Sequence, residues 1–492
     1  RFKCTIPVIH LSCPVKQKYL FSRLSTDILH RYEISLNETL EEGSTVLYNT
    51  ISEKIQKGNI KNGRPQKALI IDCGGGTTDL GSCTYTIQDK KVAYDIDIET
   101  TFENGDTNFG GNNLTYRILQ LLKLGIARQF GHPASVRDIL QGFDSEVFRY
   151  VDEHGTVAVY RELDQACDQA EELFPTRFRY FDKHNRTDYF RVKENYYYLF
   201  RLAEQVKKIF FNRAGLLQVC IGQTKNAPLD TTAVHLPMDK WKLSVLKNGQ
   251  MLPVEKCPEI TLNIYDIELL LRADIYGIIR KFLEPMYEDE QLYDYNSIKL
   301  SGQSCKIGLF ADAIKEFIPG RIIQMRKVTK DMPEQDRLHM KLSCVEGALE
   351  YLKDKKYGYA NVRIKSGHPA LPYEITANNH HGKPVTLIHR LDRKRQRGDV
   401  SRNMDNLTFK LFLNDADGIQ KHSYTYQCQQ TDFTEVTHKE LQAEYSSIDQ
   451  GETDTILEQE AKFFVWADTG LWGFHVLPVT RKRQNLMKNK SA

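Results

Sequence analysis

The chain has 492 residues, of which 41% are hydrophobic and 27% are charged, so it is long enough for about two to four domains with large cores. Its formal net charge of +3 is too small to make nucleic acid its main partner, and no apolar run reaches the length of a membrane span. Ten cysteines occur without a Cys-x-x-Cys pair, which argues against a zinc motif or a disulfide framework and favours a reducing, cytoplasmic environment.

The N-terminal part of the sequence alternates between strand and helix. Residues 6–11 are apolar and predict a strand, and residues 16–32 predict a helix. A second helix is predicted to begin at Glu42 and to run to about residue 55. Residues 57–67 are polar and contain glycine and proline, which predicts a linker.

A glycine-rich turn between two strands is the most informative feature of the sequence. The short apolar run Ala68–Ile71 predicts a buried strand, and it continues into Asp72-Cys73-Gly74-Gly75-Gly76-Thr77-Thr78-Asp79 before a second β-prone run. Adjacent glycines let backbone N–H groups converge on a phosphate, and the two threonines add hydroxyl donors. Asp72 and Asp79 supply carboxylate oxygens suited to Mg²⁺ or to its water ligands.

Two commoner phosphate-binding loops do not fit this stretch. No lysine follows the glycines as a Walker loop requires, and Asp79 stands where a dinucleotide fingerprint requires glycine. A glycine-rich hairpin turn with no ligand is the alternative. Three glycines between an aspartate and Thr-Thr-Asp exceed what such a turn needs.

Helices predominate in the following part of the chain. Gly110 and Gly111 precede a helix predicted over Leu114–Phe130, for which Asn112 is the expected cap. Residues 178–200 interleave aromatic and basic side chains, a pattern that can bind single-stranded nucleic acid. Because acidic residues are mixed in, packing within a subdomain is the favoured interpretation, and nucleic acid is an unlikely partner.

Helices are predicted between residues 202 and 317, and strands beyond residue 356. A helix predicted over Leu202–Phe211 carries Glu204 and Lys207, one turn apart. Further helices are predicted over 264–287 and 311–317, on either side of the run Ile298–Ile307. Beyond residue 356 six strand-like runs recur, at 359–364, 384–389, 407–413, 424–428, 462–466 and 473–479.

Four collinear stretches resemble the DnaK-type 70-kDa heat-shock chaperone family of the actin-like ATPase superfamily. The glycine turn resembles the family's second phosphate-binding hairpin. The other three stretches are Leu40-Glu41-Glu42-Gly43-Ser44-Thr45, Asn104-Gly105-Asp106-Thr107-Asn108-Phe109-Gly110-Gly111-Asn112-Asn113 and Ile298-Lys299-Leu300-Ser301-Gly302-Gln303-Ser304-Cys305-Lys306-Ile307. They occur in the family's order between residues 40 and 307.

The resemblance implies a role for each matching position. It implies that ATP or ADP binds with Mg²⁺, and that Asp72 and Asp79 hold the metal through water. The implied catalytic residues are Glu42, Asp72, Thr77 and Asp79. The implied nucleotide-binding residues are Gly74, Gly75, Gly76, Thr77, Gly110, Gly111, Glu204, Lys207, Gly302, Gln303, Ser304 and Lys306.

The same resemblance implies the fold and the domain order. We expect an α/β protein with actin-like, ribonuclease-H-like lobes: the later part of lobe I in 1–65, and lobe II in 66–356 with an enlarged helical and aromatic insertion at about 118–200. A β-rich domain is expected in 357–492. Because the family's first phosphate loop and its lobe-I lysine do not appear, we expect the chain to be a fragment that binds ATP weakly by itself.

The predicted function is ATP-driven conformational change coupled to binding of an unfolded peptide or a dedicated protein partner, with a co-chaperone as a further partner and no membrane association. The alternative is a scaffold or regulatory module that does not hydrolyse ATP. Three departures from the family pattern favour it: Phe211 replaces a serine, Ser301 replaces a glycine, and Lys306 replaces an arginine that stacks on adenine.

Overall fold

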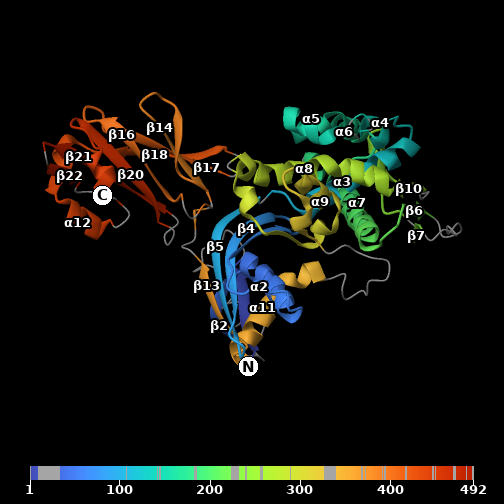
Figure 1. The fold of residues 1–492 in the computed structure, drawn as a ribbon. Coiled ribbons are helices and arrows are strands. Elements are labelled where there is room, and N and C mark those ends of the chain that lie inside the picture. The colour runs from blue at the N-terminus through green and yellow to red at the C-terminus, as the bar shows by residue number, and fades with distance from the viewer. Residues whose placement is uncertain are drawn as a thin grey trace. The chain divides into compact units, whose positions relative to one another are not determined.

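The computed structural model describes residues 2–489, except 9–33, 107, 134, 141, 143–145, 182–184, 223–231, 239–240, 255–258, 289, 326–338, 367–369, 372, 391, 393–394, 416–417, 446–447, 449, 469–472 and 484. The chain forms two compact units (Figure 1). Unit 1 comprises 1–67, 80–106 and 344–492, and unit 2 comprises 68–79 and 107–343. The helix predicted over 16–32 lies outside the described residues.

Three parallel strands carry the site of unit 2. Strand β3 (Gln66–Cys73) pairs with β11 (Ser297–Ser301), which pairs in turn with β12 (Ile323–Gln324). The central residues of β3, Ala68 to Ile71, are at most 2% exposed. Such a continuous apolar run is typical of a parallel strand that is covered on both faces. The pairing places Ser301 opposite Asp72 at the carboxyl ends of two neighbouring strands.

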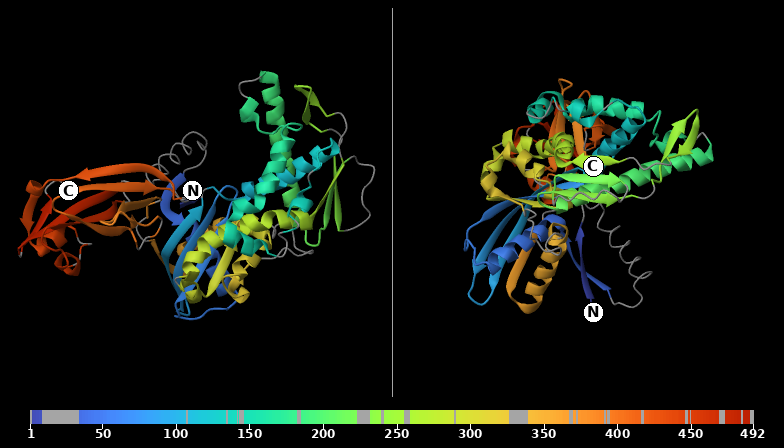
Figure 2. Two further views of the ribbon diagram at one scale, coloured as in Figure 1. Left: turned by 90° about the horizontal axis from the view of Figure 1, so that it is seen from above. Right: turned by 90° about the vertical axis from the view of Figure 1, so that its right-hand side faces the viewer.

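Helices make up most of the rest of unit 2, and α3 (Gly111–Gln129) and α7 (Arg186–Asn212) pack side by side (Figures 1 and 2). Helix α3 begins three residues before the predicted start and is capped at Gly110, so Asn112 is not its cap. The other helices are α4 (Val136–Leu140), α5 (Val147–His154), α6 (Thr156–Ala170), α8 (Ile264–Glu288) and α9 (Leu309–Lys315).

Smaller elements complete unit 2. A three-stranded sheet has the order β10-β6-β7, and β8 pairs with β9 as a hairpin. Their bounds are Gln218–Gly222 for β6, Ala233–Pro237 for β7, Ser244–Lys247 for β8, Gln250–Pro253 for β9 and Ile260–Asn263 for β10. Strands therefore predominate in the described residues between the end of α7 and the start of α8. Single 3₁₀ turns are η2 (Phe178–Phe181), η3 (Gln291–Asp294), η4 (Gln303–Lys306) and η5 (Gly320–Ile322).

Unit 1 contains the strands β4 (Thr78–Asp89, whose first two residues belong to unit 2), β5 (Tyr94–Asp106) and β13 (Ala360–Ser366). Strand β13 pairs in parallel with β5, so the run predicted at 359–364 belongs to this sheet and not to the C-terminal β region. A further parallel pair joins β1 (Phe2–Val8) to β2 (Ile34–Glu41).

In unit 1, α2 (Glu42–Gln56) packs against the part of α11 (His339–Tyr357) that begins at Cys344. The Tyr48 hydroxyl donates to Asp354 over 2.7 Å, and Thr45 Oγ1 lies 3.0 Å from Cys344 Sγ. At Gly347 the two backbones come so close that a Cβ atom would lie 1.8 Å from the Thr45 carbonyl oxygen. The helix pair therefore depends on the missing side chain at this position.

The C-terminal region forms two antiparallel sheets, with the orders β15-β14-β17-β18 and β16-β20-β21-β22-β19. Both sheets contribute to one apolar core that includes Ile375, Phe409 and Phe463, as in a sandwich. The bounds are β14 Glu374–Asn378, β15 Pro384–Ile388, β16 Arg397–Asn403, β17 Thr408–Asn414, β18 Gln420–Gln427, β19 Phe433–Val436, β20 Glu460–Asp468, β21 Gly473–Lys482 and β22 Asn485–Asn489, with short helices α12 (His438–Glu444), α13 (Gln450–Asp454) and η6 (Gln430–Asp432).

The mixed α/β architecture and the β-rich C-terminal region confirm the coarse fold prediction. The longest described helices all carry charged residues at short intervals, and none is both long and apolar enough to cross a membrane.

We predict that Gly347→Ala destabilises the protein, because the added methyl group would meet the backbone of α2. Overpacking of this kind costs about 1–3 kcal/mol, and sometimes more. Gly43→Ala is the matched control, since nothing lies within 4 Å of a Cβ atom at that position in α2. Thermal unfolding monitored by circular dichroism should show a lower Tm for the first variant and no loss for the second. Equal Tm values for both variants would contradict the packing at Gly347.

Candidate functional site

The glycine turn connects β3 to β4 as the sequence predicts. Its ends are fixed by a hydrogen bond of 2.9 Å from the Gly74 N–H to the Thr77 carbonyl. The buried Thr78 hydroxyl donates to the Phe109 carbonyl over 3.0 Å, which ties the turn to the segment before α3. Gly75 and Gly76 at the tip of the turn are exposed.

The Gly110–Gly111 segment meets the turn through backbone atoms. The Gly111 N–H donates to the Gly74 carbonyl over 2.9 Å, and the Asn112 N–H donates to the Gly75 carbonyl over 2.7 Å. A Cβ atom at Gly110 would lie 2.7 Å from Gly76 C and Thr77 N. The backbone at Gly110 is extended, with φ of −172°, so glycine is needed here for close approach and not for conformation.

The Gly302–Lys306 segment approaches the turn from β11. Gly302 has φ of +81°, and a Cβ atom there would lie 2.3 Å from the Cys73 carbonyl oxygen, so both conformation and space require glycine. The Ser304 hydroxyl donates to the Gly74 carbonyl over 3.3 Å. The Nε2 atom of Gln303 is buried and has no hydrogen-bond partner among the described residues, which is costly unless a ligand or water supplies one.

Helix α7 completes the site with its Glu204 and Lys207 pair. The Lys207 ammonium donates to the Gly111 carbonyl at 2.7 Å and to Thr115 Oγ1 at 2.6 Å, and it lies 2.7 Å from the Glu204 carboxylate. Burial lowers the pKa of Lys207. Burial opposes ionisation of Glu204, but hydrogen bonds from Lys207 and Thr115 outweigh it and lower its pKa.

Two residues of this network were not identified from the sequence. Thr115 bonds to the Gly111 carbonyl at 2.9 Å and to Glu204 at 2.6 Å. Asn212, the last residue of α7, accepts a hydrogen bond of 3.0 Å from the Lys306 ammonium. Thr115 lies one helical turn after Gly111, which is a signal for a bond to the first carbonyl of α3; no local pattern marks Asn212.

Asp72 and Asp79 place two carboxylates at the base of the turn. Burial raises the pKa of Asp72, against a hydrogen bond from Ser301. Burial and the neighbouring charge of Asp72 together raise the pKa of Asp79 to about 6, although the Thr77 hydroxyl donates to it over 3.3 Å. Two half-buried carboxylates, one of which is destabilised by the charge of the other, are a favourable environment for a divalent cation.

The residues present fit Mg²⁺ bound together with a phosphate. Among the described residues no cluster of three or more His, Cys, Asp or Glu side chains could hold a metal ion. Mg²⁺ commonly binds through one or two carboxylates, with water and substrate phosphate completing its shell. The pair of Asp72 and Asp79 matches that smaller requirement.

Glu42, the remaining predicted catalytic residue, is the first residue of α2 in unit 1. Its side chain lies outside the described part of the structure. All the other predicted site residues belong to unit 2, and the contacts above bring them together.

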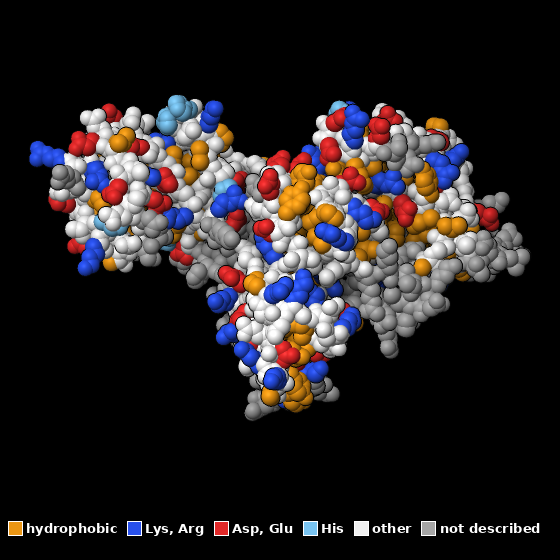
Figure 3. Space-filling view, in the orientation of Figure 1, with side chains coloured by type: hydrophobic (Ala, Val, Ile, Leu, Met, Phe, Trp, Pro, Cys, Tyr) orange, Lys and Arg blue, Asp and Glu red, His pale blue; other side chains and the backbone are white. Residues whose placement is uncertain are grey.

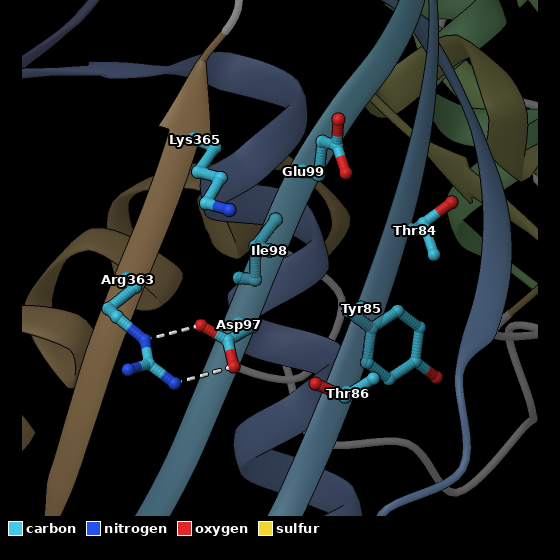
Figure 4. A pocket seen from close by; sticks show the side chains of 8 residues that line it. All are labelled: Thr84, Tyr85, Thr86, Asp97, Ile98, Glu99, Arg363 and Lys365. Atoms are coloured by element: carbon cyan, nitrogen blue, oxygen red, sulfur yellow. Dashed lines mark hydrogen bonds and ion pairs between the residues drawn. The ribbon is translucent and has the colours of Figure 1, made fainter.

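Unit 1 contains a separate cavity of about 420 Å³ on the face of β4, β5 and β13 (Figure 4). Arg363 forms two hydrogen bonds to Asp97, of 2.5 and 2.8 Å, which lower the pKa of that carboxyl. Because these opposite charges neutralise each other across the strands, the cavity is a weaker candidate for binding an anionic ligand than the glycine turn is. Its lining residues are Thr84, Tyr85, Thr86, Asp97, Ile98, Glu99, Arg363 and Lys365.

We predict that Asp79→Asn stabilises the ligand-free protein at pH 8 but not at pH 4.5. The folded protein keeps the Asp79 proton up to about pH 6, whereas the unfolded chain releases it near pH 4. Wild-type stability therefore falls as the pH rises through this window, by on the order of 1–3 kcal/mol. An amide cannot ionise, so the variant avoids this loss.

Urea unfolding at the two pH values measures the effect. Asp405→Asn, at an exposed position in the C-terminal region, should give no gain that depends on pH. A gain from Asp79→Asn of equal size at both pH values would contradict the assignment of a buried, destabilised carboxylate.

Comparison with known proteins gives no indication of function, so the function is inferred from the site itself. No family model matches the chain, and no curated protein matches it.

Proposed function

We propose that the chain binds ATP with Mg²⁺ at the glycine turn of unit 2, as a divergent member of the DnaK-type branch of actin-like ATPases. Nucleotide binding and hydrolysis would drive a conformational change that controls binding of a peptide or protein by the C-terminal β region. Four stretches that resemble the family motifs support this proposal, and three of them contact one another in unit 2.

The proposal rests mainly on Gly75 and Gly76, because neither packing nor backbone conformation requires glycine at these positions. Nothing in the chain lies within 4 Å of a Cβ atom at either position, and neither residue has a positive φ. Packing and conformation would therefore both accept a side chain. A side chain at either position would instead occupy open space next to the turn. The N–H groups of Gly75, Gly76 and Thr77 donate to no backbone acceptor among the described residues. Such a cluster of N–H groups suits a phosphate.

The arrangement of strands is also compatible with a ribonuclease-H-like lobe. In unit 2, β11 and β12 lie parallel to β3, and helices follow β5 and β11 in the chain. In unit 1, β4 and β5 are neighbours, joined by a hydrogen bond of 2.8 Å between Ser82 and Thr101. The order of the elements along the chain supports the expected lobe.

Phosphoryl transfer at this site would rely on positioning and charge neutralisation. The turn N–H groups would hold the phosphate oxygens, and the Thr77 hydroxyl would donate to them instead of to Asp79. Asp79 could then orient the attacking water as an acceptor, with Asp72 beside it. Bound Mg²⁺ would neutralise phosphate charge. Lys207 would act indirectly, because it holds the Gly111 carbonyl and with it the segment that fixes the turn.

A scaffold that does not hydrolyse ATP is the second candidate, and the lysine contacts favour it. Lys207 is bound to Gly111, Thr115 and Glu204, and Lys306 is bound to Asn212. Both cations that the resemblance assigns to the nucleotide are thus engaged within the protein. Release of inorganic phosphate from saturating Mg·ATP would support the ATPase, and binding without release would support the scaffold.

Strand β18 is the feature of the C-terminal region that best supports partner binding. It lies at the end of its sheet, and seven of its eight residues are exposed. An exposed strand edge can add a strand from an extended peptide, with backbone hydrogen bonds supplying affinity. This property is compatible with an unfolded peptide, a dedicated protein partner or a co-chaperone.

We predict that Gly76→Ala weakens Mg·ATP binding at least tenfold while the ligand-free protein unfolds at an unchanged temperature. The methyl group would occupy the space beside the turn N–H groups, but it would touch no protein atom. Titration of the protein into Mg·ATP, followed by ³¹P NMR line broadening, measures binding even in the millimolar range.

Two further glycine variants serve as controls. Gly451→Ala also adds a methyl group in open space, far along the chain in α13, and should bind like wild type. Gly110→Ala should lower the unfolding temperature, because its methyl group would meet Gly76 and Thr77. Wild-type affinity in Gly76→Ala would refute phosphate binding at the turn.

A further inference from the structure

One side of helix α7 is rich in aromatic and basic residues between Arg186 and Arg201. We call this the α7 aromatic face. It lies opposite the buried side of the same helix, which includes Val192, Asn195, Leu199 and Leu202, because positions three or four apart share a side of a helix. The members of the face are Arg186, Tyr189, Phe190, Lys193, Tyr196, Tyr197, Phe200 and Arg201.

The rings of this face pack on one another and still reach solvent. Phe178 from η2 stacks on Tyr197 with ring centroids 6.0 Å apart and an angle of 27° between the planes. Tyr196 and Phe200 stack similarly, at 6.0 Å and 28°. Phe190 is 47% exposed and Tyr197 is 48% exposed. On the surface drawn in Figure 3, hydrophobic side chains appear over the helices of unit 2. The face is therefore partly packed but not covered.

Two of the three basic side chains of the face lie over aromatic rings. The Arg186 guanidinium is 5.8 Å from the Phe190 ring, and the Lys193 ammonium is 5.8 Å from the Phe178 ring and 5.7 Å from the Tyr189 ring. Among the described residues, Arg186, Lys193 and Arg201 form no ion pair with a carboxylate; Arg201 reaches the carbonyl of Tyr197 on its own helix.

Two acidic residues occur in this segment. Asp188 lies on the opposite side of the helix, whereas the exposed Glu194, four positions after Phe190 and three before Tyr197, lies at the margin of the face. The face therefore holds three cations against one carboxylate. The local charge of the face is positive, although the net charge of the chain is only +3.

We propose that the α7 aromatic face binds single-stranded nucleic acid. Exposed rings offer stacking platforms for unpaired bases, and unpaired cations beside them attract the phosphate backbone. A duplex would present fewer free base faces, so single strands should be preferred. The chemistry is shared by DNA and RNA. The site is distinct from the glycine turn and does not depend on nucleotide binding there.

Fluorescence anisotropy with labelled 12-nucleotide oligo-dT and oligo-U tests the proposal, and the two probes distinguish DNA from RNA. Three phosphate contacts predict that a plot of log affinity against log salt concentration has a slope of about −2. The affinity should therefore fall by about 20-fold between 50 and 200 mM salt. Tyr197→Ala should weaken binding by about 5- to 100-fold through lost stacking. Arg201→Gln should weaken binding and make the salt slope shallower by about 0.7.

Matched variants separate stacking from general surface effects. Tyr197→Phe keeps the ring and should bind like wild type. Tyr293→Ala removes a tyrosine that is 67% exposed in η3, outside the face, and should also bind like wild type.

Three results would overturn the proposal. The first is no binding of either oligonucleotide at low salt. The second is equal affinity for a duplex of the same length. The third is equal weakening by Tyr197→Ala and Tyr293→Ala. Capture of peptides that is lost in Tyr197→Ala, without any binding of oligonucleotides, would assign the face to a protein partner instead.

Discussion

The site depends on the close meeting of three backbone segments at Gly74. The Gly74 carbonyl accepts the Gly111 N–H at 2.9 Å and the Ser304 hydroxyl at 3.3 Å. Side chains at Gly110 or Gly302 would collide with the turn at 2.7 and 2.3 Å. Because these contacts join the three segments, the inner side of the turn is held in place. Gly75 and Gly76 at its tip are exposed, and their N–H groups donate to no backbone acceptor among the described residues. Preorganised donors of this kind are effective for binding a charged group.

The site holds two carboxylates whose charged forms are destabilised, and the fold alone does not require them there. Asp72 and Asp79 are both held where burial opposes their charge, and the charge of Asp72 adds to the effect at Asp79. Nearby, Lys207 and Glu204 are buried as a mutually satisfied pair. Raised pKa values of two neighbouring carboxylates beside a glycine turn favour a functional role over a purely structural one. A bound cation would stabilise the charged forms of both aspartates, whereas the Lys207–Glu204 ion pair needs no ligand.

Local sequence patterns predicted the parts of the site but not all of its contacts. The apolar run before Asp72, the three glycines and the i, i+3 pair of Glu204 and Lys207 are local signals, and each lies where the pattern indicated. Asn112 was wrongly expected to cap α3, because the close approach at Gly110 moves the start of the helix. The bond between Lys306 and Asn212 joins residues that are 94 positions apart, and no periodicity predicts such a contact.

Outside the site as well, local patterns predicted elements but not the long-range contacts between them. The strand at 359–364 was predicted correctly as a strand, but its parallel pairing with β5 depends on tertiary structure. On α7, helical periodicity gathers the aromatic residues on one side, whereas Asp188 lies on the opposite side and Glu194 at the margin of the aromatic one. The lobes of an actin-like ATPase remain a proposal that rests on motif resemblance and on the order of the elements.

Amide hydrogen exchange of the peptide that spans residues 73–79 tests the central claim most directly. If the N–H groups of Gly75, Gly76 and Thr77 hold phosphate, saturating Mg·ATP should slow their exchange strongly, and AMP, which lacks the β- and γ-phosphates, should not. Exchange in the β8–β9 hairpin (Ser244–Pro253), which has no part in the site, serves as the internal reference. Unchanged exchange at residues 75–77 under conditions where Mg·ATP is bound would contradict the account.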